Sequence, residues 1–340
     1  MKSDRQNPIV TMLLLLLLGG LFWGSNLLSA APAVASEELL TSRGTPLSGV
    51  INCFVGRYYW LSIALSIFLA FNISFRVARL TVRNVRFLDR SYMPALVFMI
   101  ICCGCFISVH MLVPMMAVSM IIRASKWLFR SYSLKSSAAG VCLVAGAYYG
   151  LAVSIFAPAL YLVPVLFVGI AMFRLFNCRE WLSALGGVAL PLLCSGYVAW
   201  LMGQSWCSTY CDFVNELFKN NNLWGFITHI TWLDMAFFGS TSALVILSVI
   251  KFLKRGKGNS PKAYKAYIYF MWILLAVIVV LVLSPSGSYL MMPLLALPCA
   301  VLIPTLFAGR IPGFWPNFLY SLLVISAVAS TVLPLIIANL

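Results

Sequence analysis

Carboxylates are the residues of this sequence with the clearest capacity for chemistry, because a carboxylate can act as a general base or bind a divalent cation. The chain has eight acidic residues. Glu37 and Glu38 follow the first apolar segment, whereas Asp212, Glu216 and Asp234 lie much later in the chain. Gathered at one face of a membrane, these five would form a site for base catalysis or for cation binding. The alternative is that they are solvated loop charges.

Residues 208–219 form a second candidate region. Apolar side chains recur there at helical spacing, while Asp212, Glu216 and Lys219 fall on the other side. The pattern predicts an amphipathic helix in a membrane interface, either as an anchor or as a lid over a cavity that admits a lipid head group. The tryptophans that flank it, which are typical of head-group depth, are Trp206, Trp224 and Trp232.

His110 and ten cysteines complete the set of residues that could do chemistry. His110 stands between two short apolar segments, where it could bind a phosphate, relay a proton or satisfy backbone groups at a turn. A zinc site needs at least three suitable protein ligands, and no spacing of the cysteines with the two histidines supplies them. We therefore expect no metal site and no cofactor from these residues.

The composition defines the class of protein. Hydrophobic residues make up 62% of the chain and charged residues 9%, with a mean hydropathy of +0.99. Soluble domains carry about 25% charged residues, so a soluble or disordered chain is excluded. The sequence predicts an all-α, polytopic integral membrane protein with one membrane domain over residues 1–340.

The net charge of +15 comes from basic residues clustered between apolar segments, which is typical of loops that face anionic lipid. We therefore expect the lipid bilayer, and not nucleic acid, as a partner.

Eleven apolar segments are candidates for the roughly 20-residue helix that crosses a bilayer. They are 9–28, 58–75, 94–109, 111–122, 138–156, 158–173, 181–202, 235–250, 266–283, 289–308 and 314–338. The first segment, with basic residues before it, is either an uncleaved signal anchor over residues 1–28 or a signal peptide. Cleavage of a signal peptide would leave ten segments.

Loop charges predict the orientation of these segments. With the N-terminus in the cytoplasm, 20 of the 23 Lys and Arg residues fall on the inner side, in agreement with the positive-inside rule. We therefore predict a bacterial inner-membrane protein with a cytoplasmic N-terminus and a periplasmic C-terminus. The outer-face loops are then 29–57 and 203–234. The inner loops are expected to hold the arginines of residues 76–93 and the basic residues of 123–135.

Residues 94–122 pose a separate problem, since only His110 divides two short apolar segments there. One straight helix would place one of two strongly basic loops on the outer side of the membrane. We therefore predict that the chain enters and returns, either as two thin crossings or as a re-entrant hairpin. Small residues elsewhere, around Gly146 and Gly150 and at Gly186 and Gly187, favour close packing of helices.

Four stretches resemble an uncharacterised family of polytopic membrane proteins of Bacteroidetes, a domain-of-unknown-function family. They are RSYMPALVFMI at 90–100, HMLVPMMAVSMIIRASKWLFRSYS at 110–133, FNCREWLSALGGVALPLL at 176–193 and SPSGSYLMMPLLALP at 284–298. More distantly, the layout is similar to that of GT-C glycosyltransferases. This similarity implies a lipid-linked sugar donor, a divalent cation, and a catalytic carboxylate in the first outer loop, where Glu37 and Glu38 are the matching positions.

Two functions from different classes follow. The first, which the sequence favours, is a non-enzymatic envelope protein that acts as a scaffold, a subunit or a lipid-handling partner of other envelope membrane proteins. The second is a GT-C-like transferase that moves a sugar from a polyprenyl-phosphate carrier at the outer face, and a transporter is a third alternative. A cavity beneath residues 203–234 that reaches Glu37 or Glu38 would favour the transferase. Packed outer loops beside an apolar flank would favour the scaffold.

Overall fold

The structure is a computed structural model. It describes residues 58–84, 92–104, 112–134, 138–173, 177–201, 205–218, 232–255, 261–283, 291–307 and 314–338, together with Gly203 and a few single positions before residue 58. Every regular element in these ranges is a helix. Apolar runs favour helices because a helix satisfies its backbone N–H and C=O groups within one segment, without help from water.

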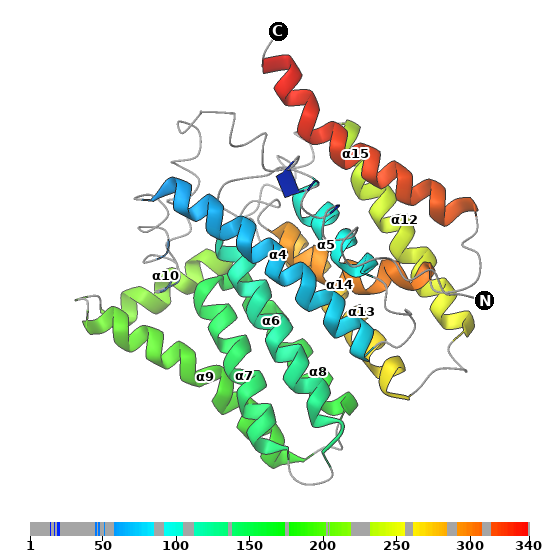
Figure 1. The fold of residues 1–340 in the computed structure, drawn as a ribbon. Coiled ribbons are helices and arrows are strands. Elements are labelled where there is room, and N and C mark those ends of the chain that lie inside the picture. Colours follow the sequence, from blue (N-terminus) through cyan, green and yellow to red (C-terminus); the bar gives the residue numbers. More distant parts are fainter. Residues whose placement is uncertain are drawn as a thin grey trace.

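Each apolar segment expected after residue 57 contains a helix. The helices are α4 (Tyr59–Asn84), α5 (Met93–Cys103), α6 (Leu112–Ser131), α7 (Ala139–Ile155), η2 (Ala157–Leu162), α8 (Val163–Phe173), α9 (Cys178–Leu201), α10 (Trp206–Phe218), α12 (Trp232–Arg255), α13 (Pro261–Leu283), α14 (Met292–Leu302), η5 (Ile303–Leu306) and α15 (Phe314–Ala338). They form one bundle of crossing helices (Figure 1).

Five of the described helices are long and apolar enough to cross a membrane. They run through Trp60–Arg83, Leu112–Ser131, Cys178–Leu201, Trp232–Lys254 and Pro261–Leu281. Shorter apolar helices, among them α5, α7 and α14, accompany them. The expected class, an α-helical membrane protein, agrees with this architecture. The count of eleven spans is not confirmed.

Several helices continue beyond the apolar segments that predict them. Residues 58–75 predict α4, which ends only at Asn84, and residues 111–122 predict α6, which ends at Ser131. The expectation that Arg79 and Arg123 lie in loops is therefore wrong, since both are helical. Arginine and lysine are good helix formers, and their long aliphatic stems let the backbone stay helical while the charge reaches a polar environment.

Residues 94–122 do not form one helix. α5 ends at Cys103 and α6 begins at Leu112, as the loop charges predict. Pro94 lies in the first turn of α5, where the missing proline N–H costs least. Residues 105–111, including His110, lie outside the described residues.

The centre of the bundle is α14, in which every residue is buried. A helix that is hydrophobic on all sides is expected to lie inside a protein. α14 packs against α5, α13 and α6, and α4 and α12 also contact it. The surrounding helices expose large apolar side chains, such as Phe68 of α4, Ile246 of α12 and Leu275 of α13, as helices that face lipid do.

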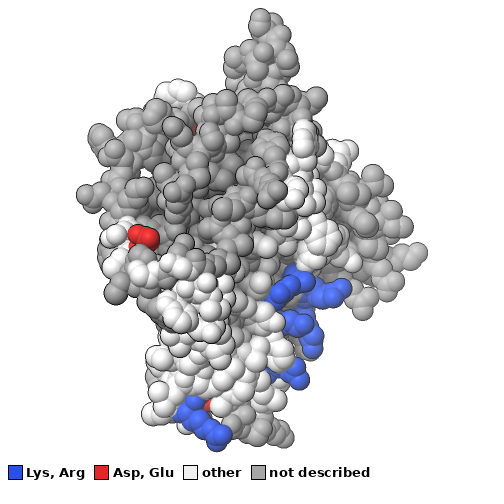
Figure 2. Space-filling view, turned by 90° about the vertical axis from the view of Figure 1, so that its left-hand side faces the viewer, with Lys and Arg blue, Asp and Glu red and all other residues white. Residues whose placement is uncertain are grey.

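The described basic residues gather at one end of the bundle. They occupy the C-terminal halves of α4, α6 and α12 and the first turns of α9 and α13, which lie toward the lower and right-hand side of Figure 1. Figure 2 shows Lys and Arg side chains on the lower part of one face and an acidic group higher up. The residues are Arg76, Arg79, Arg83, Arg123, Lys126, Arg130, Arg179, Lys251, Lys254, Lys262 and Lys265.

Candidate functional site

The helix pair α7–α9 is held together by small residues. A Cβ added to Gly146 would overlap the backbone carbonyl of Ala184, and one added to Gly150 would overlap that of Val188. On the facing helix, a Cβ at Gly187 would overlap the carbonyl of Leu143. The two backbones are therefore in direct contact, which is the close packing that these glycines predict.

Polar contacts fix the other end of the same pair. The buried carboxylate of Glu180, in the first turn of α9, accepts a hydrogen bond of 3.1 Å from the backbone N–H of Ala138 at the start of α7. Ser183 donates to the carbonyl of Ala139 over 2.6 Å. Trp181 stacks on Phe167 of α8 with ring centroids 5.3 Å apart. The first half of α9 is thus fixed in position and in rotation about its axis by α7 and α8 on one side.

The opposite side of α9 is apolar and exposed, and α9 lies at the left-hand edge of the bundle (Figure 1). Its large side chains are between 44% and 69% exposed. They repeat at helical spacing over the whole helix, so they form one continuous strip. We call these residues the α9 strip: Leu182, Leu185, Leu190, Leu193, Tyr197, Val198, Trp200 and Leu201.

α10 packs against the far end of α9 and against η2. The hydroxyl of Tyr210 donates to the carbonyl of Leu192 over 3.1 Å, and Tyr161 of η2 donates to the carbonyl of Leu217 over 3.3 Å. Burial raises the pKa of Tyr210, so its phenol stays protonated as a donor. Leu217 is buried whereas Asp212 is exposed. A helix is therefore present where residues 208–219 predict one, with one side packed on the bundle and the other open.

The described candidate residues do not converge. Asp212 is exposed on α10, whereas Asp234 is 2% exposed in the first turn of α12, a helix that packs against α15 and η5 on the other side of the bundle (Figure 1). Asp234 was expected in an outer loop, and this is wrong: α12 begins at Trp232, and its positive N-terminal end favours a carboxylate. Trp232 itself is 88% exposed.

The other candidates are described only in part. Trp206 and Glu216 belong to α10, but their side chains lie outside the described part of the structure. Glu37, Glu38, His110 and Trp224 lie outside the described residues altogether, as does most of residues 1–57. Within the described ranges, no three His, Cys, Asp or Glu residues come together to hold a metal ion.

Buried hydroxyl groups form two networks that the sequence does not reveal. In the first, Tyr149 of α7 and Tyr269 of α13 share a hydrogen bond of 2.8 Å, and Ser125 of α6 lies 3.4 Å from the Tyr269 hydroxyl. In the second, Ser248 of α12 bonds the Tyr267 hydroxyl over 2.9 Å and donates to a carbonyl of α14. Tyr267 and Tyr269 thus point to opposite sides of α13 and form hydrogen bonds with different neighbouring helices.

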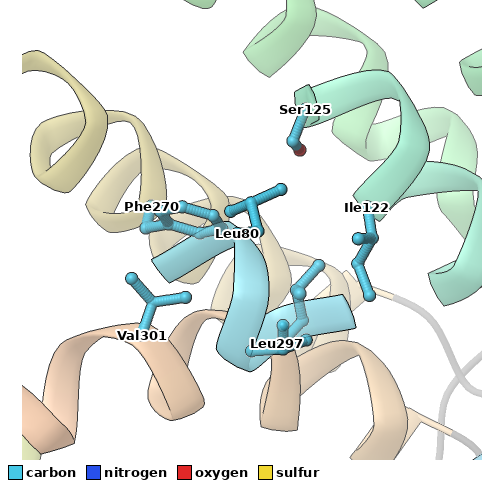
Figure 3. Close-up of a pocket in the computed structure, with 7 residues that line it drawn as sticks. Leu80, Ile122, Ser125, Phe270, Leu297 and Val301 are labelled. Carbon is cyan, nitrogen blue, oxygen red and sulfur yellow. The ribbon is translucent and has the colours of Figure 1, made fainter. Parts of the chain in front are cut away.

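A narrow apolar crevice separates α4, α6, α13 and α14 (Figure 3). Leu80, Ile122, Phe270 and Leu297 point into it, with Ser125 at its edge. About 180 Å³ of space, part of it open to the surroundings, lies between these side chains, and it is nowhere wide enough for a water molecule. The crevice therefore separates packed helices and does not form a substrate chamber.

Two arginines were missed as a possible site because they were assigned to loops. Arg76 of α4 and Arg123 of α6 are both half-buried and close enough to interact electrostatically. A signal was present in the sequence. Basic residues occur at 76, 79 and 83 and again at 123, 126 and 130, which is helical spacing in both cases.

Comparisons of the chain with protein-family models, with curated proteins and with solved structures find no match.

Proposed function

We propose that this protein is a non-enzymatic, multi-pass component of the bacterial inner membrane that acts as a scaffold or subunit and binds a membrane-embedded protein through α9 and α10. Its N-terminus would lie in the cytoplasm and its C-terminus in the periplasm, with eleven membrane segments when the first is retained. This orientation places the basic ends of the helices against the anionic inner leaflet.

The observation that carries the proposal is the two-sided character of α9. One side is fixed to α7 through Gly146, Gly150 and Gly187, and the other side carries the α9 strip at the edge of the bundle. A rigid helix with exposed Leu, Tyr and Trp side chains loses little conformational entropy when a second helix packs on it. Aromatic residues are also enriched where protein partners bind most tightly.

α10 supports the same proposal. It crosses the end of α9 and leaves Asp212, Val214 and Asn215 exposed. A partner that packs along the α9 strip would meet the polar groups of Asp212 and Asn215 at the membrane surface. Apolar packing within the membrane combined with polar contacts at its surface would give higher binding specificity than apolar contacts alone.

Site-specific photo-crosslinking in living cells tests the proposal. A photoreactive residue replaces Leu193 in the α9 strip, and the matched control replaces Leu275 of α13, which is 53% exposed compared with 57% for Leu193. We expect one discrete protein adduct from position 193 and only lipid adducts from position 275. The partner is identified by mass spectrometry, and a crosslinker placed on the partner must then recapture this protein.

Lipid adducts alone at both positions would contradict the proposal, because the α9 strip would then face lipid in the same way as the rest of the bundle. The same protein adducts from both positions would indicate random collisions in the membrane and would also contradict it.

A further inference from the structure

The basic end of the bundle contains two guanidinium groups that lie close together on neighbouring helices. Arg76 belongs to α4 and Arg123 to α6, and these two helices pack against each other. Their neighbours Val77 and Ile122 line the same crevice, which places both arginines at one level of the bundle. Both side chains are half-buried.

Two half-buried guanidinium groups repel each other, because both carry a positive charge and water screens them only in part. An anion between them would offset this repulsion. Within the residues that the structure describes, no carboxylate pairs with Arg76 or Arg123. Arg123 instead directs one guanidinium nitrogen toward the sulfur of Met120, at 3.7 Å. Tyr148 of α7 also lies near enough to Arg76 for an electrostatic interaction. Arg76 therefore has a second guanidinium group and a phenol in its electrostatic surroundings. These are donors of the kind that bind a phosphate.

The exposed face of α4 indicates what carries that phosphate. Phe68 and Phe75 are 62% and 37% exposed and lie one above the other at a spacing of two helical turns. Arg79, exposed as well, continues the same face one turn further on. The face thus changes from aromatic to basic along the helix, which matches a molecule with an apolar chain and an anionic head. A soluble phosphate would make no contact with the aromatic half of this face.

The depth of the pair agrees with a lipid. From Arg76 to Arg83 the helix α4 rises about 10 Å, and from Arg123 to Ser131 the helix α6 rises about 12 Å. Both arginines therefore lie well inside the basic end of the bundle, while Arg79, Lys126 and Arg130 surround them nearer the helix ends. Basic pockets between transmembrane helices are known to bind anionic head groups.

We propose that Arg76 and Arg123, with Tyr148 beside them, bind the phosphodiester head group of one anionic phospholipid, whose acyl chain lies along Phe68 and Phe75 of α4. This site is independent of the α9 strip, which lies on a different helix. It would fix the protein to an anionic leaflet at a defined point.

Native mass spectrometry of the purified full-length protein, titrated with phosphatidylglycerol or with phosphatidylcholine, tests this. We expect the wild type to prefer phosphatidylglycerol. The double variant Arg76→Gln/Arg123→Gln should lose affinity by roughly tenfold for each arginine, because a charge-assisted hydrogen bond to the head group is lost each time. Lys254→Gln on α12 is the control, because it removes a positive charge from the same end of the bundle and should leave the affinity unchanged.

Three results would overturn the proposal: an unchanged affinity in the double variant, an equal loss in Lys254→Gln, or full displacement of the lipid by millimolar inorganic phosphate, which would indicate a site for a soluble anion. Phosphatidylglycerol should also raise the thermal stability of the wild type and not of the double variant. If the glutamine variant does not fold, Arg76→Lys/Arg123→Lys keeps both charges and loses only the forked geometry. It should bind with intermediate affinity, and wild-type affinity would contradict a role for the guanidinium fork.

Discussion

Replacing Gly187 by Ala tests the packing on which the position of α9 depends. The new Cβ would lie 3.0 Å from the backbone nitrogen of Ala147 and 3.1 Å from the Cα of Gly146, and it would overlap the carbonyl oxygen of Leu143. All three are backbone atoms, so no side-chain rotation can relieve the clash. α7 and α9 would have to separate instead.

The expected cost follows from these distances. Non-bonded carbon atoms prefer separations of about 3.5–4.0 Å, so the helices must move apart by roughly 0.5–1 Å. Overpacking of this kind costs about 1–3 kcal/mol. Alanine also favours a helix over glycine by about 1 kcal/mol. This gain applies equally to Gly186→Ala, where a Cβ meets nothing within 4 Å. The difference between the two variants therefore isolates the clash.

The assay is equilibrium unfolding in mixed micelles with increasing SDS. We expect Gly186→Ala to be as stable as the wild type or more stable, and Gly187→Ala to be less stable than Gly186→Ala by about 1–3 kcal/mol. Adding Gly146→Ala to Gly187→Ala should cost less than the sum of the single changes, because both residues belong to one contact. Equal stability of Gly186→Ala and Gly187→Ala would refute the direct contact of the two backbones.

Two further predictions concern the buried hydroxyl groups and the alternative function. Tyr269→Phe should lower the free energy of unfolding by about 1–3 kcal/mol, because it leaves the buried Tyr149 hydroxyl without its partner. Tyr149→Phe/Tyr269→Phe should cost less than the sum of the single changes, and additive costs in the same SDS titration would contradict the hydrogen bond. The double variant Glu37→Gln/Glu38→Gln should complement a deletion strain at normal protein levels. Loss of a catalytic base would cost about 10² to 10⁴ in rate, so a null phenotype with intact expression would favour the glycosyltransferase.

The class of the fold could be predicted from the sequence because the apolar segments are long and the charges are few. The division of residues 94–122 into two helices also followed from the charges, since a straight helix would have separated Arg90 from Arg123. The lengths of α4 and α6 could not be predicted from hydropathy. Arginine ends an apolar segment without ending a helix, so the residues after Phe75 and Ile122 were placed in loops.

The contacts within the bundle were less accessible to sequence reasoning. Glycine spacing indicated that α7 would pack closely on some helix, but it did not identify α9 as the partner. The pairing of Tyr149 with Tyr269 joins residues 120 positions apart and depends on how the helices rotate about their axes. The burial of Asp234 likewise depends on where α12 begins, and hydropathy places that start three residues too late.

Two native cysteines report directly on which side of the membrane each end of α9 lies. Cys178 is exposed at the basic end of α9. Cys211 is exposed on α10, which packs against the second half of α9 through Tyr210 and Leu192. The 24 residues of α9 span about 36 Å, enough to cross a bilayer. Intact spheroplasts are treated with a membrane-impermeant thiol reagent, and the modified peptides are identified by mass spectrometry before and after permeabilisation. We predict that Cys211 reacts in intact spheroplasts and that Cys178 reacts only after permeabilisation. Labelling of both cysteines from the same side would contradict a membrane-spanning α9 and, with it, the proposed orientation of the whole bundle.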